Sequence, residues 1–391
     1  MSARVLRPLV LPANPAVLDA RRDLLALLNG EAAYLPLPAD SPAEVQRLSQ
    51  ALAVDEPIRD DAVLVVSTSG TTGTPKGAMH TAGSLRASAD ATAEQLGGPG
   101  SWLLALPPHH IAGMQVMLRS LAAGHDPVVL DLTEGFNPVT FAEELRSMRG
   151  ERRYTSLVPG QLWKALSYQP AVEALRDVDG ILVGGAATGP DLLAAAFDAR
   201  LPIVRTYGMS ETAGGCVYDG SPLRGVQIKV SDPDDAGIGR VALGGPTLAL
   251  GYRNLPNHPA FAEPGWFQTD DLGRFTSADS GDLLEIVGRA DEAISTGGLT
   301  VIPQIVESVL QAFGEIAECA VFGLPDDRLG EKIVAAVVLT PGSDLDVAAV
   351  RELVTKRLDR YAVPRKIFYV DALPLRGPGK VDRRALVEQF S

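Results

Sequence analysis

The spacing of apolar and polar residues predicts strands that alternate with helices over the first half of the chain. Short runs of aliphatic and β-branched residues end in a Gly, Ser, Thr or Pro turn, and Ala/Leu-rich stretches of helical character follow them. Four such runs are Ala62–Val66, Ser101–Leu106, Pro127–Leu132 and Gly180–Val183. This alternation is typical of α/β layering with at least one mainly parallel sheet.

The composition of the sequence and the elements that it predicts change near residues 282–291. Before it, Val226–Tyr252 is Gly-rich and β-like, as in a small barrel or an antiparallel sheet. After it, helices and strands are predicted at Pro303–Phe313, Cys319–Gly323, Val334–Leu339, Asp346–Asp359 and Lys366–Val370. Such a unit of about 100 residues has the usual size of a domain. We therefore predict a large α/β domain with a β-rich subdomain over residues 1–288, a hinge at 289–292 and a small mobile α+β domain over 293–391.

The amino-acid composition argues against some classes of function. The 391 residues carry 35 Lys and Arg against 48 Asp and Glu, and the resulting charge of −13 argues against a protein that neutralises nucleic-acid phosphates. Only two cysteines are present, far apart, so a reducing compartment is the simpler interpretation. Neither a signal peptide nor a membrane span is expected. We expect a cytoplasmic protein, and a homodimer is compatible with the sequence.

The strongest local motif follows the first predicted strand. It is a loop rich in hydroxyl residues and glycine that ends in Pro-Lys-Gly, with the sequence Thr68-Ser69-Gly70-Thr71-Thr72-Gly73-Thr74-Pro75-Lys76-Gly77. Backbone N–H groups and hydroxyls in such a loop can hold phosphates, and a lysine can offset their charge. It is not a Walker A loop, because Lys76 follows Pro75 and no Ser or Thr follows the lysine. The alternative is a surface loop without a ligand.

This loop resembles the phosphate-binding loop of the adenylate-forming superfamily, which includes acyl-CoA synthetases, luciferases and peptide-synthetase adenylation domains. Further segments resemble that family's motifs in the family's order. Gly184-Gly185-Ala186-Ala187 is similar to a turn that lines adenine and the acyl pocket, and Tyr207-Gly208-Met209-Ser210-Glu211 is similar to the Tyr-Gly-x-Thr/Ser-Glu motif. The resemblance implies that Tyr207 lies against adenine, that Ser210 contacts the α-phosphate and that Glu211 helps to hold Mg²⁺.

The same resemblance continues into the second half of the chain. Asp271 matches the carboxylate that binds the ribose hydroxyls, although Asp270 stands where the family usually has glycine. Arg289 matches a residue on the ribose side, and Asp291 matches the pivot of the small domain. Taken alone, each of these charged segments could be an ordinary solvated turn or linker.

Two motifs of the family remain in the last hundred residues. Gly297-Gly298 matches the loop that approaches the pantetheine of CoA, but Leu299-Thr300 departs from the more frequent Glu-Asn. Near the end, Pro374-Leu375-Arg376-Gly377-Pro378-Gly379-Lys380-Val381-Asp382-Arg383 resembles the signature whose lysine is catalytic. The resemblance therefore implies that Lys380 is the catalytic lysine, and that ATP, Mg²⁺ and coenzyme A are used.

The family's chemistry implies a carboxylate that is first activated as an acyl-adenylate and then transferred to a thiol. Pro107-Pro108-His109-His110 resembles the family's Pro-x-x-His segment, whose histidine, here His110, borders the acyl site. Arg119 stands in an otherwise apolar helix-like run. We predict that His110 and Arg119 serve the acyl site, where the positive charge of Arg119 would pair with a second carboxylate of the substrate. The alternative for Arg119 is a side chain that caps or snorkels from its own helix.

Within the family, the short chain, the segment from His110 to Arg119 and Leu299-Thr300 resemble a compact o-succinylbenzoate–CoA ligase of menaquinone biosynthesis. Three alternatives stay open. The chain could be another small aryl- or acyl-CoA ligase, it could load a carrier protein in trans, or it could bind nucleotide without catalysis.

Overall fold

The computed structural model describes residues 4–68, 75–279, 281–376 and 380–391, without the side chains of Arg376 and Lys380. The chain divides into two compact units. Unit 1 comprises residues 1–228 and 242–268, and unit 2 comprises 229–241 and 269–391. This division falls before the predicted hinge at 289–292. A compact unit need not be the unit that moves, so the hinge stays a prediction.

Unit 1 begins with a four-stranded sheet in the order β1-β2-β3-β4. The first three strands are parallel and β4 is antiparallel to β3. Their bounds are β1 Leu6–Leu11, β2 Ala33–Pro38, β3 Leu64–Thr68 and β4 Lys76–His80. The predicted phosphate loop thus leaves β3 and returns as β4.

The main sheet of unit 1 has seven strands in the order β11-β10-β9-β8-β7-β5-β6. The strands from β9 to β6 are parallel, while β10 and β11 are antiparallel to their neighbours. Their bounds are β5 Ser101–Leu104, β6 Val128–Val129, β7 Arg153–Leu157, β8 Gly180–Val183, β9 Ile203–Met209, β10 Gly214–Tyr218 and β11 Ser221–Pro222. This confirms the predicted mainly parallel sheet. In such sheets ligands bind beyond the carboxyl ends of the strands.

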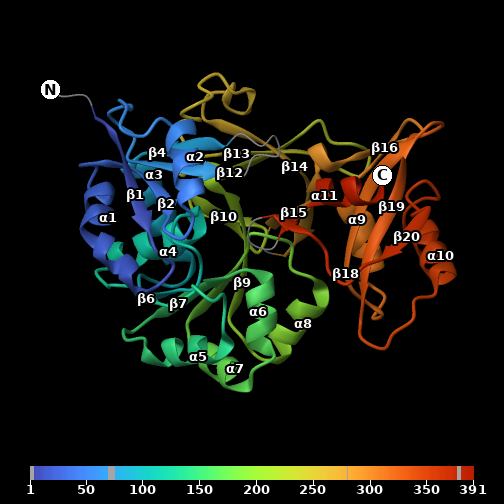
Figure 1. Cartoon of the computed structure of the whole chain (residues 1–391), viewed down its shortest axis with the longest axis horizontal. Helices are drawn as coiled ribbons and strands as arrows, with labels where there is room; N and C mark the ends of the chain where they lie inside the picture. The colour runs from blue at the N-terminus through green and yellow to red at the C-terminus, as the bar shows by residue number, and fades with distance from the viewer. Residues whose placement is uncertain (1–3, 69–74, 280, 377–379) are drawn as a thin grey trace. The chain divides into compact units, whose positions relative to one another are not determined.

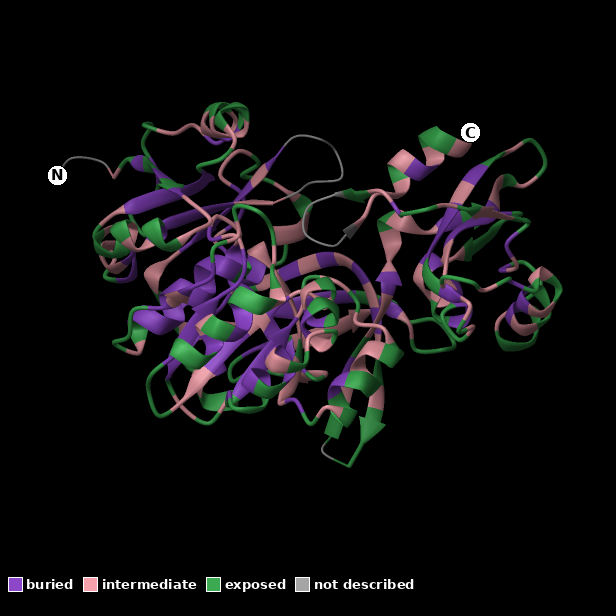
Figure 2. Cartoon of the chain, turned by 60° about the horizontal axis from the view of Figure 1, so that its bottom comes forward, coloured by how far each residue is buried: buried purple, intermediate pink, exposed green. Residues whose placement is uncertain are grey.

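Helices cover the main sheet (Figure 1). The helices of unit 1 are η1 Pro15–Ala20, α1 Arg21–Leu28, α2 Pro42–Ala51, α3 Ala82–Gln95, α4 Ile111–Ala122, α5 Pro138–Ser147, α6 Pro159–Leu166, α7 Gln169–Arg176 and α8 Pro190–Asp198, with short η2 Ser210–Thr212 and η3 Pro259–Phe261; of these, α2 packs on the first sheet. Apolar residues of α5 to α8 form one core with β5, β7 and β8, for example Phe141, Leu162, Leu175 and Ile181. Figure 2 shows the buried residues gathered on strands and on the inner sides of helices.

A third sheet, antiparallel between its last two strands, has the order β12-β13-β14-β15. Its strands are β12 Gln227–Ser231, β13 Gly239–Gly244, β14 Trp266–Ala278 and β15 Gly281–Arg289. The division between the two units passes through β12, β13 and β14. The predicted β-rich region is therefore present, and residues 229–241 group with the later part of the chain.

The rest of unit 2 is a five-stranded sheet with helices. Its strands are β16 Ile294–Thr296, β17 Leu299–Val301, β18 Ile316–Asp326, β19 Gly330–Leu339 and β20 Lys366–Tyr369. Its helices are η4 Ala290–Glu292, α9 Pro303–Leu310, α10 Val347–Arg357 and α11 Arg383–Phe390, and a two-stranded ribbon joins β21 Leu375–Arg376 to β22 Lys380–Val381. One face of the sheet packs on α9 and α10, through residues such as Val306 and Val350. This confirms the predicted α+β fold.

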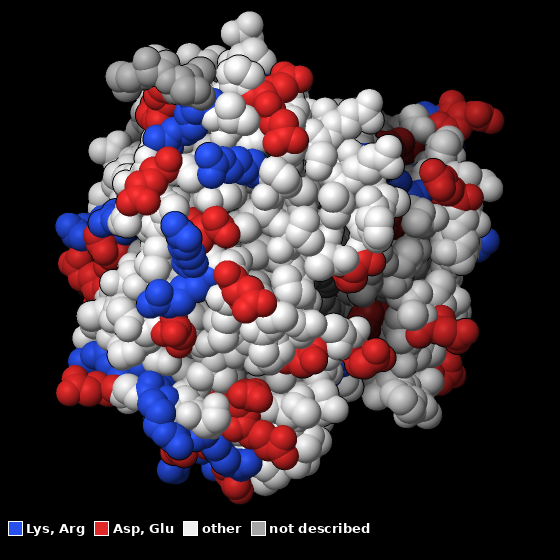
Figure 3. Space-filling model, turned by 60° about the vertical axis from the view of Figure 1, so that its left-hand side comes forward, with Lys and Arg blue, Asp and Glu red and all other residues white. Residues whose placement is uncertain are grey.

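The surface agrees with the acidic composition. On the face drawn in Figure 3, basic and acidic side chains are interspersed, without one large basic patch. Among the helices of the described residues, none is both long and apolar enough to cross a bilayer.

Candidate active site

The described ends of the predicted phosphate loop lie side by side. Thr68, the last residue of β3, is paired with Lys76, the first residue of β4. Thr68 Oγ1 is buried and has no hydrogen-bond partner among the described residues, so it is available at the base of the loop. The candidate residues Ser69, Gly70, Thr71, Thr72 and Gly73 lie outside the described residues.

The exit of this loop is held by a later segment of unit 1. The Asn254 side chain accepts from Gly77 N at 3.2 Å and donates to Pro75 O at 2.8 Å. A Cβ at Gly77 would lie 2.7 Å from side-chain carbons of Leu52 and Val65. A larger residue at the end of Pro-Lys-Gly would thus have to displace these side chains.

Two further candidate segments follow neighbouring parallel strands at one edge of the main sheet. Gly184, Gly185 and Ala186 come directly after β8, and Ser210 and Glu211 come directly after β9. Tyr207 and Gly208 lie within β9 itself, and a Cβ at Gly208 would lie 2.2 Å from Gly214 O. The structure therefore brings together the residues assigned to adenine, the α-phosphate and Mg²⁺.

The turn that carries Ser210 and Glu211 is fixed from several elements. His80, the last residue of β4, bonds through Nε2 to Ser210 O at 2.6 Å. Gln115 Nε2 and Ser88 Oγ both donate to Ala213 O, at 2.8 and 3.0 Å. Ala213 itself has a left-handed φ of +54°, which costs energy for a residue other than glycine. These contacts hold the turn in one conformation.

His80 is neutral in this position. Burial lowers the pKa of His80 to about 4, against the raising effect of its bond to the Ser210 carbonyl. Because a carbonyl oxygen only accepts, Nε2 carries the proton. His80 therefore donates one permanent hydrogen bond and does not exchange protons near neutral pH.

Glu211 is nearly buried, with 7% of its surface exposed. The Tyr252 hydroxyl donates to Glu211 Oε1 at 2.5 Å. The Lys76 ammonium lies 4.9 Å from the centre of the same tyrosine ring. His80 and Tyr252 were missed by sequence reasoning, since single polar residues in apolar runs carry no signal of their own.

The candidate acyl residue His110 lies at the start of α4, beyond the carboxyl end of β5 and at the same edge of the main sheet. Its ring lies 4.2 Å from that of His109. Burial, and to a lesser extent the charge of His110, lowers the pKa of His109 to about 4. The negative charges of Asp40 and Glu44 act in the opposite direction. His109 is therefore neutral near neutral pH.

Arg119 is not brought to this edge. It lies near the opposite end of α4, about 13 Å along the helix from His110. Its guanidinium carbon lies 5.4 Å from the ring centre of Trp102, at the beginning of β5, and it lines a small cavity with Asp90. The structure therefore does not bring Arg119 together with His110, and its role at the acyl site stays a prediction.

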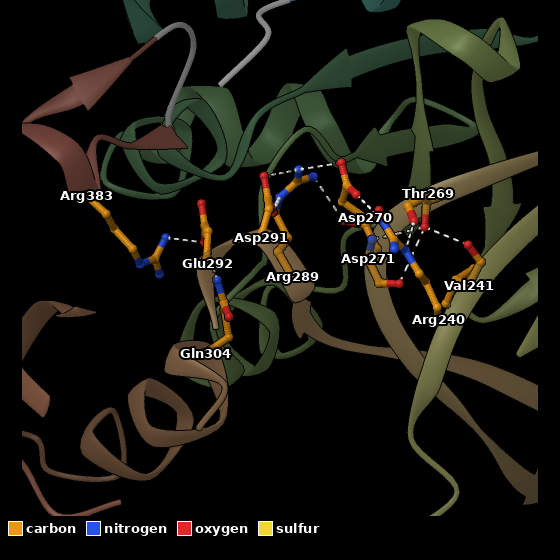
Figure 4. Close-up of polar contacts among 10 residues, drawn as sticks. All are labelled: Arg240, Val241, Thr269, Asp270, Asp271, Arg289, Asp291, Glu292, Gln304 and Arg383. Carbon is orange, nitrogen blue, oxygen red and sulfur yellow. Dashed lines mark hydrogen bonds and ion pairs between the residues drawn. The ribbon is translucent and has the colours of Figure 1, made fainter. Parts of the chain in front are cut away.

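The ribose-side candidates form a charged cluster in unit 2 (Figure 4). Asp271 in β14 is paired across the sheet with Arg289 in β15, and their side chains meet at 3.2 Å. Arg289 also binds both carboxylate oxygens of Asp291, at 2.8 and 2.9 Å. Burial opposes the charge of Arg289, but the bonds to Asp291 and the charges of Asp271 and Asp291 outweigh it and raise the pKa of Arg289.

Asp270, which replaces the family's glycine, joins the same cluster. Its carboxylate contacts Arg240 and lies 3.7 Å from Arg289 Nη2. Arg240 also donates to Thr269 O at 2.8 Å. The departure from the family's pattern thus leaves Asp271 in place, and Arg240 is a residue that sequence reasoning missed.

A second charged cluster in unit 2 surrounds Arg383. Its guanidinium binds Glu292 at 2.7 Å and Glu307 at 2.6 Å and donates to Val321 O at 3.1 Å. Gln304 donates to the same oxygen of Glu292 at 2.5 Å. Glu292 directly follows the predicted pivot Asp291. Arg383 therefore ties the segment after Lys380 to Glu292, the last residue of the predicted hinge.

The remaining candidates of unit 2 lie in short turns. Gly297 and Gly298 form the two-residue turn between β16 and β17, with φ of +59° and +82°, values that favour glycine in such hairpins. Lys380 begins β22, where it is paired with Arg376; its side chain lies outside the described atoms.

Comparison with known families matches both parts of the chain. The profile of the AMP-binding enzyme family matches residues 12–253, and the profile of the AMP-binding enzyme C-terminal domain matches residues 305–380. The chain belongs to the AMP-binding enzyme family. The second match ends at Lys380, the residue predicted to be catalytic.

Two relatives of this chain carry the same enzyme name. A probable 2-succinylbenzoate–CoA ligase of Mycobacterium tuberculosis is 51% identical over 387 residues, which is 99% of both chains. A 2-succinylbenzoate–CoA ligase of Enterococcus faecalis is 30% identical over 344 residues, covering 83% of this chain and 69% of that protein. The resemblance inferred from the motifs is confirmed.

Solved structures of the family show the same fold. An amide bond synthetase from Marinactinospora thermotolerans matches with a TM-score of 0.84 at 24% identity, covering 100% of this chain and 91% of that one. The o-succinylbenzoate CoA synthetase of Bacillus subtilis, in complex with its acyl-adenylate intermediate, matches with a TM-score of 0.80 at 24% identity, covering 98% and 88%. The predicted fold class is confirmed.

The family's use of Mg²⁺ can be tested against the residues present. Among the described residues, no group of three or more His, Cys, Asp or Glu side chains could hold a metal. Glu211 offers one carboxylate beside the phosphate loop, and Mg²⁺ in nucleotide sites is held by one or two carboxylates together with phosphates. The donor set fits a metal that arrives with ATP.

Replacing Arg119 with methionine is expected to change the KM for the acid by less than about twofold. The reason is its distance from His110; the loss of its contact with Trp102 should instead lower the free energy of unfolding by about 1 kcal/mol. Steady-state kinetics and denaturant unfolding measure the two effects. His110→Ala is the comparison variant, expected to raise the KM for the acid. A large rise in KM with Arg119→Met would instead support the acyl-site role predicted from the sequence.

Proposed function

We propose that the chain is an AMP-forming acid–CoA ligase whose acid is 2-succinylbenzoate, a step of menaquinone biosynthesis. The observation that carries the choice of acid is the 51% identity to the M. tuberculosis relative over the full length of both chains. The gathering of Tyr207, Ser210 and Glu211 beside the ends of the phosphate loop supports the adenylating chemistry. ATP and CoA are cytoplasmic metabolites, so we place the reaction in the cytoplasm.

The first step joins a carboxylate oxygen of the acid to the α-phosphorus of ATP and breaks the bond from that phosphorus to pyrophosphate. Both reactants are anions, so catalysis consists mainly of positioning and charge neutralisation. In this proposal Lys380 bridges the carboxylate and the α-phosphate, and the loop from Thr68 to Lys76 holds the outer phosphates. Glu211 would hold Mg²⁺, which supplies further neutralisation of phosphate charge when bound.

The nucleoside is held by other residues. Tyr207 lies against adenine, with Gly184, Gly185, Ala186 and Gly208 allowing close approach of the backbone. Asp271 accepts from the ribose hydroxyls, and Arg289, already bound to Asp271 and Asp291, fixes its orientation.

In the second step the CoA sulfur, after losing its proton, attacks the acyl carbonyl carbon and AMP leaves. We propose that the small domain turns about Asp291 between the two steps, so that Gly297 and Gly298 replace Lys380 beside the adenylate. Closure of this hinge type gates many two-step enzymes. His110 borders the acyl group throughout.

The proposal is tested by pyrophosphate release with ATP and a panel of acids, followed by mass spectrometry of the products. We expect 2-succinylbenzoate to be preferred over benzoate and medium-chain fatty acids, and its CoA thioester to form when CoA is present. Preference for another acid would contradict the choice of substrate. Acyl transfer to a carrier protein or an amine, but not to CoA, would contradict the choice of acceptor.

A further inference from the structure

One segment of unit 1 links the phosphate loop to the turn that carries Glu211. Residues 250–254, here called the strap, run along β4. Leu250 N donates to Met79 O at 2.8 Å, Met79 N donates to Gly251 O at 3.0 Å, and Arg253 N donates to Gly77 O at 2.8 Å. The strap thus extends the sheet beside the strand that begins with Lys76.

The strap is anchored on its other side as well. The Arg253 guanidinium donates to four backbone carbonyls, those of Leu52, Ala53, Pro57 and Glu56, at 2.6, 2.8, 3.2 and 3.5 Å. Backbone pairing on one side and this side chain on the other leave the strap little freedom. Tyr252, in its middle, is therefore held by its neighbours on both sides in the chain.

The ring of Tyr252 is fixed by packing. Only 2% of the residue is exposed. His258 and Phe261 contact the ring edge-on, with centroids at 4.9 and 5.3 Å. The direction of its hydroxyl is therefore set before any ligand binds, and that hydroxyl is the one that donates to Glu211 Oε1.

The ring of Tyr252 interacts with a positively charged group, and its hydroxyl interacts with a negatively charged one. The Lys76 ammonium lies 4.9 Å from the ring centre, a distance at which the negative face of the ring attracts a cation. The hydroxyl orients the nearly buried carboxylate of Glu211. One side chain thus sets the positions of a cation and an anion, Lys76 and Glu211, that are 135 residues apart in sequence.

We infer that Tyr252 is a positioning residue for the phosphate end of ATP: its hydroxyl orients the Glu211 carboxylate, and its ring places the Lys76 ammonium. The inference rests on the proposed function, since it assigns phosphate contacts to Lys76 and Glu211. Loss of a hydrogen-bond partner of a metal-binding side chain commonly lowers metal affinity or activity by about 10- to 100-fold. A tyrosine that served packing alone would have no such selective effect.

Tyr252→Phe tests this, because it removes only the hydroxyl oxygen. Tyr218→Phe is the matched control: Tyr218 is also buried in unit 1, at 1% exposure, and its hydroxyl bonds to Thr92 Oγ1 at 3.0 Å, a contact that involves none of the candidate site residues. Binding of ATP and of AMP, each with Mg²⁺, is measured by titration calorimetry. AMP has no β- or γ-phosphate and so reports on the nucleoside end.

Tyr252→Phe is expected to weaken ATP binding by about tenfold while AMP binding stays within about twofold. Tyr252→Leu also removes the ring, so a further loss of about threefold in ATP affinity is expected. Tyr218→Phe should change neither affinity. Unchanged ATP binding by Tyr252→Phe, or an equal loss for ATP and AMP, would overturn the inference. Wild-type protein that bound no ATP would overturn the proposed function itself.

Discussion

Lys380→Ala is expected to slow pyrophosphate release from acid and ATP by about 10²- to 10³-fold, because the first step loses the cation that offsets two reacting anions. Thioester formation from supplied acyl-adenylate should stay within a few-fold of the wild-type rate. In that half-reaction the adenylyl group has already been transferred to the acid. Quenched-flow measurements of each half-reaction give the two rates separately.

The matched control for this variant is Lys356→Ala. Lys356 lies exposed at the end of α10 in the same unit, so its loss removes one ammonium without touching the candidate site. It should leave both half-reactions unchanged. Equal losses in both half-reactions for Lys380→Ala would contradict the division of labour between Lys380 and the Gly297-Gly298 turn.

Arg383→Met is expected to destabilise unit 2 by about 3–5 kcal/mol. The guanidinium is 17% exposed, and Glu292 and Glu307 are each 12% exposed, so its removal leaves two mostly buried carboxylates without their cation. Hydrogen exchange read by mass spectrometry on peptides of unit 2 measures the effect. All three tryptophans, Trp102, Trp163 and Trp266, belong to unit 1, so their fluorescence reports whether that unit stays intact.

Arg384→Met is the control for this variant, because Arg384 is the exposed neighbour in the same helix. It should leave exchange in unit 2 unchanged. If the amides of unit 2 were equally protected from hydrogen exchange in the Arg383→Met and Arg384→Met proteins, a structural role for the Arg383 cluster would be contradicted.

The loss of folding stability caused by Arg383→Met should depend on pH. Burial raises the pKa of Glu307, and the charge of Arg383 opposes this rise. A raised pKa means that the folded state holds the proton more tightly, so stability falls as pH rises through the folded-state value. Without Arg383 the pKa rises further, and the variant should lose most stability above neutral pH and least in mild acid. An equal loss at roughly pH 5 and roughly pH 8 would contradict this linkage.

Elements set by local pattern were predictable. The run Gly180–Val183 was predicted as a strand and is β8 with the same bounds. Cys319–Gly323 was predicted too short: β18 runs from Ile316 to Asp326, because pairing with β19 continues beyond the apolar stretch. Pro127–Leu132 was predicted too long, since only Val128 and Val129 pair at the edge of the main sheet.

Features that depend on pairing between distant segments could not be predicted. The meeting of Asp271 with Arg289 requires the register of β14 and β15, which no local pattern gives. The sequence also does not say which end of α4 lies at the ligand edge, so the distance between His110 and Arg119 could not be foreseen. Tyr252 and His80 resemble ordinary core residues until the turn at Ser210 is placed between them.

The central claim is that the acid is activated by forming a bond to AMP. It is tested most directly with 2-succinylbenzoate whose carboxylate oxygens are heavy-oxygen-labelled, incubated with ATP, CoA and the protein. Mass spectrometry should find one labelled oxygen atom in each AMP, together with the CoA thioester, because the attacking oxygen leaves with the phosphate. Unlabelled AMP, or ADP and phosphate in its place, would contradict the account.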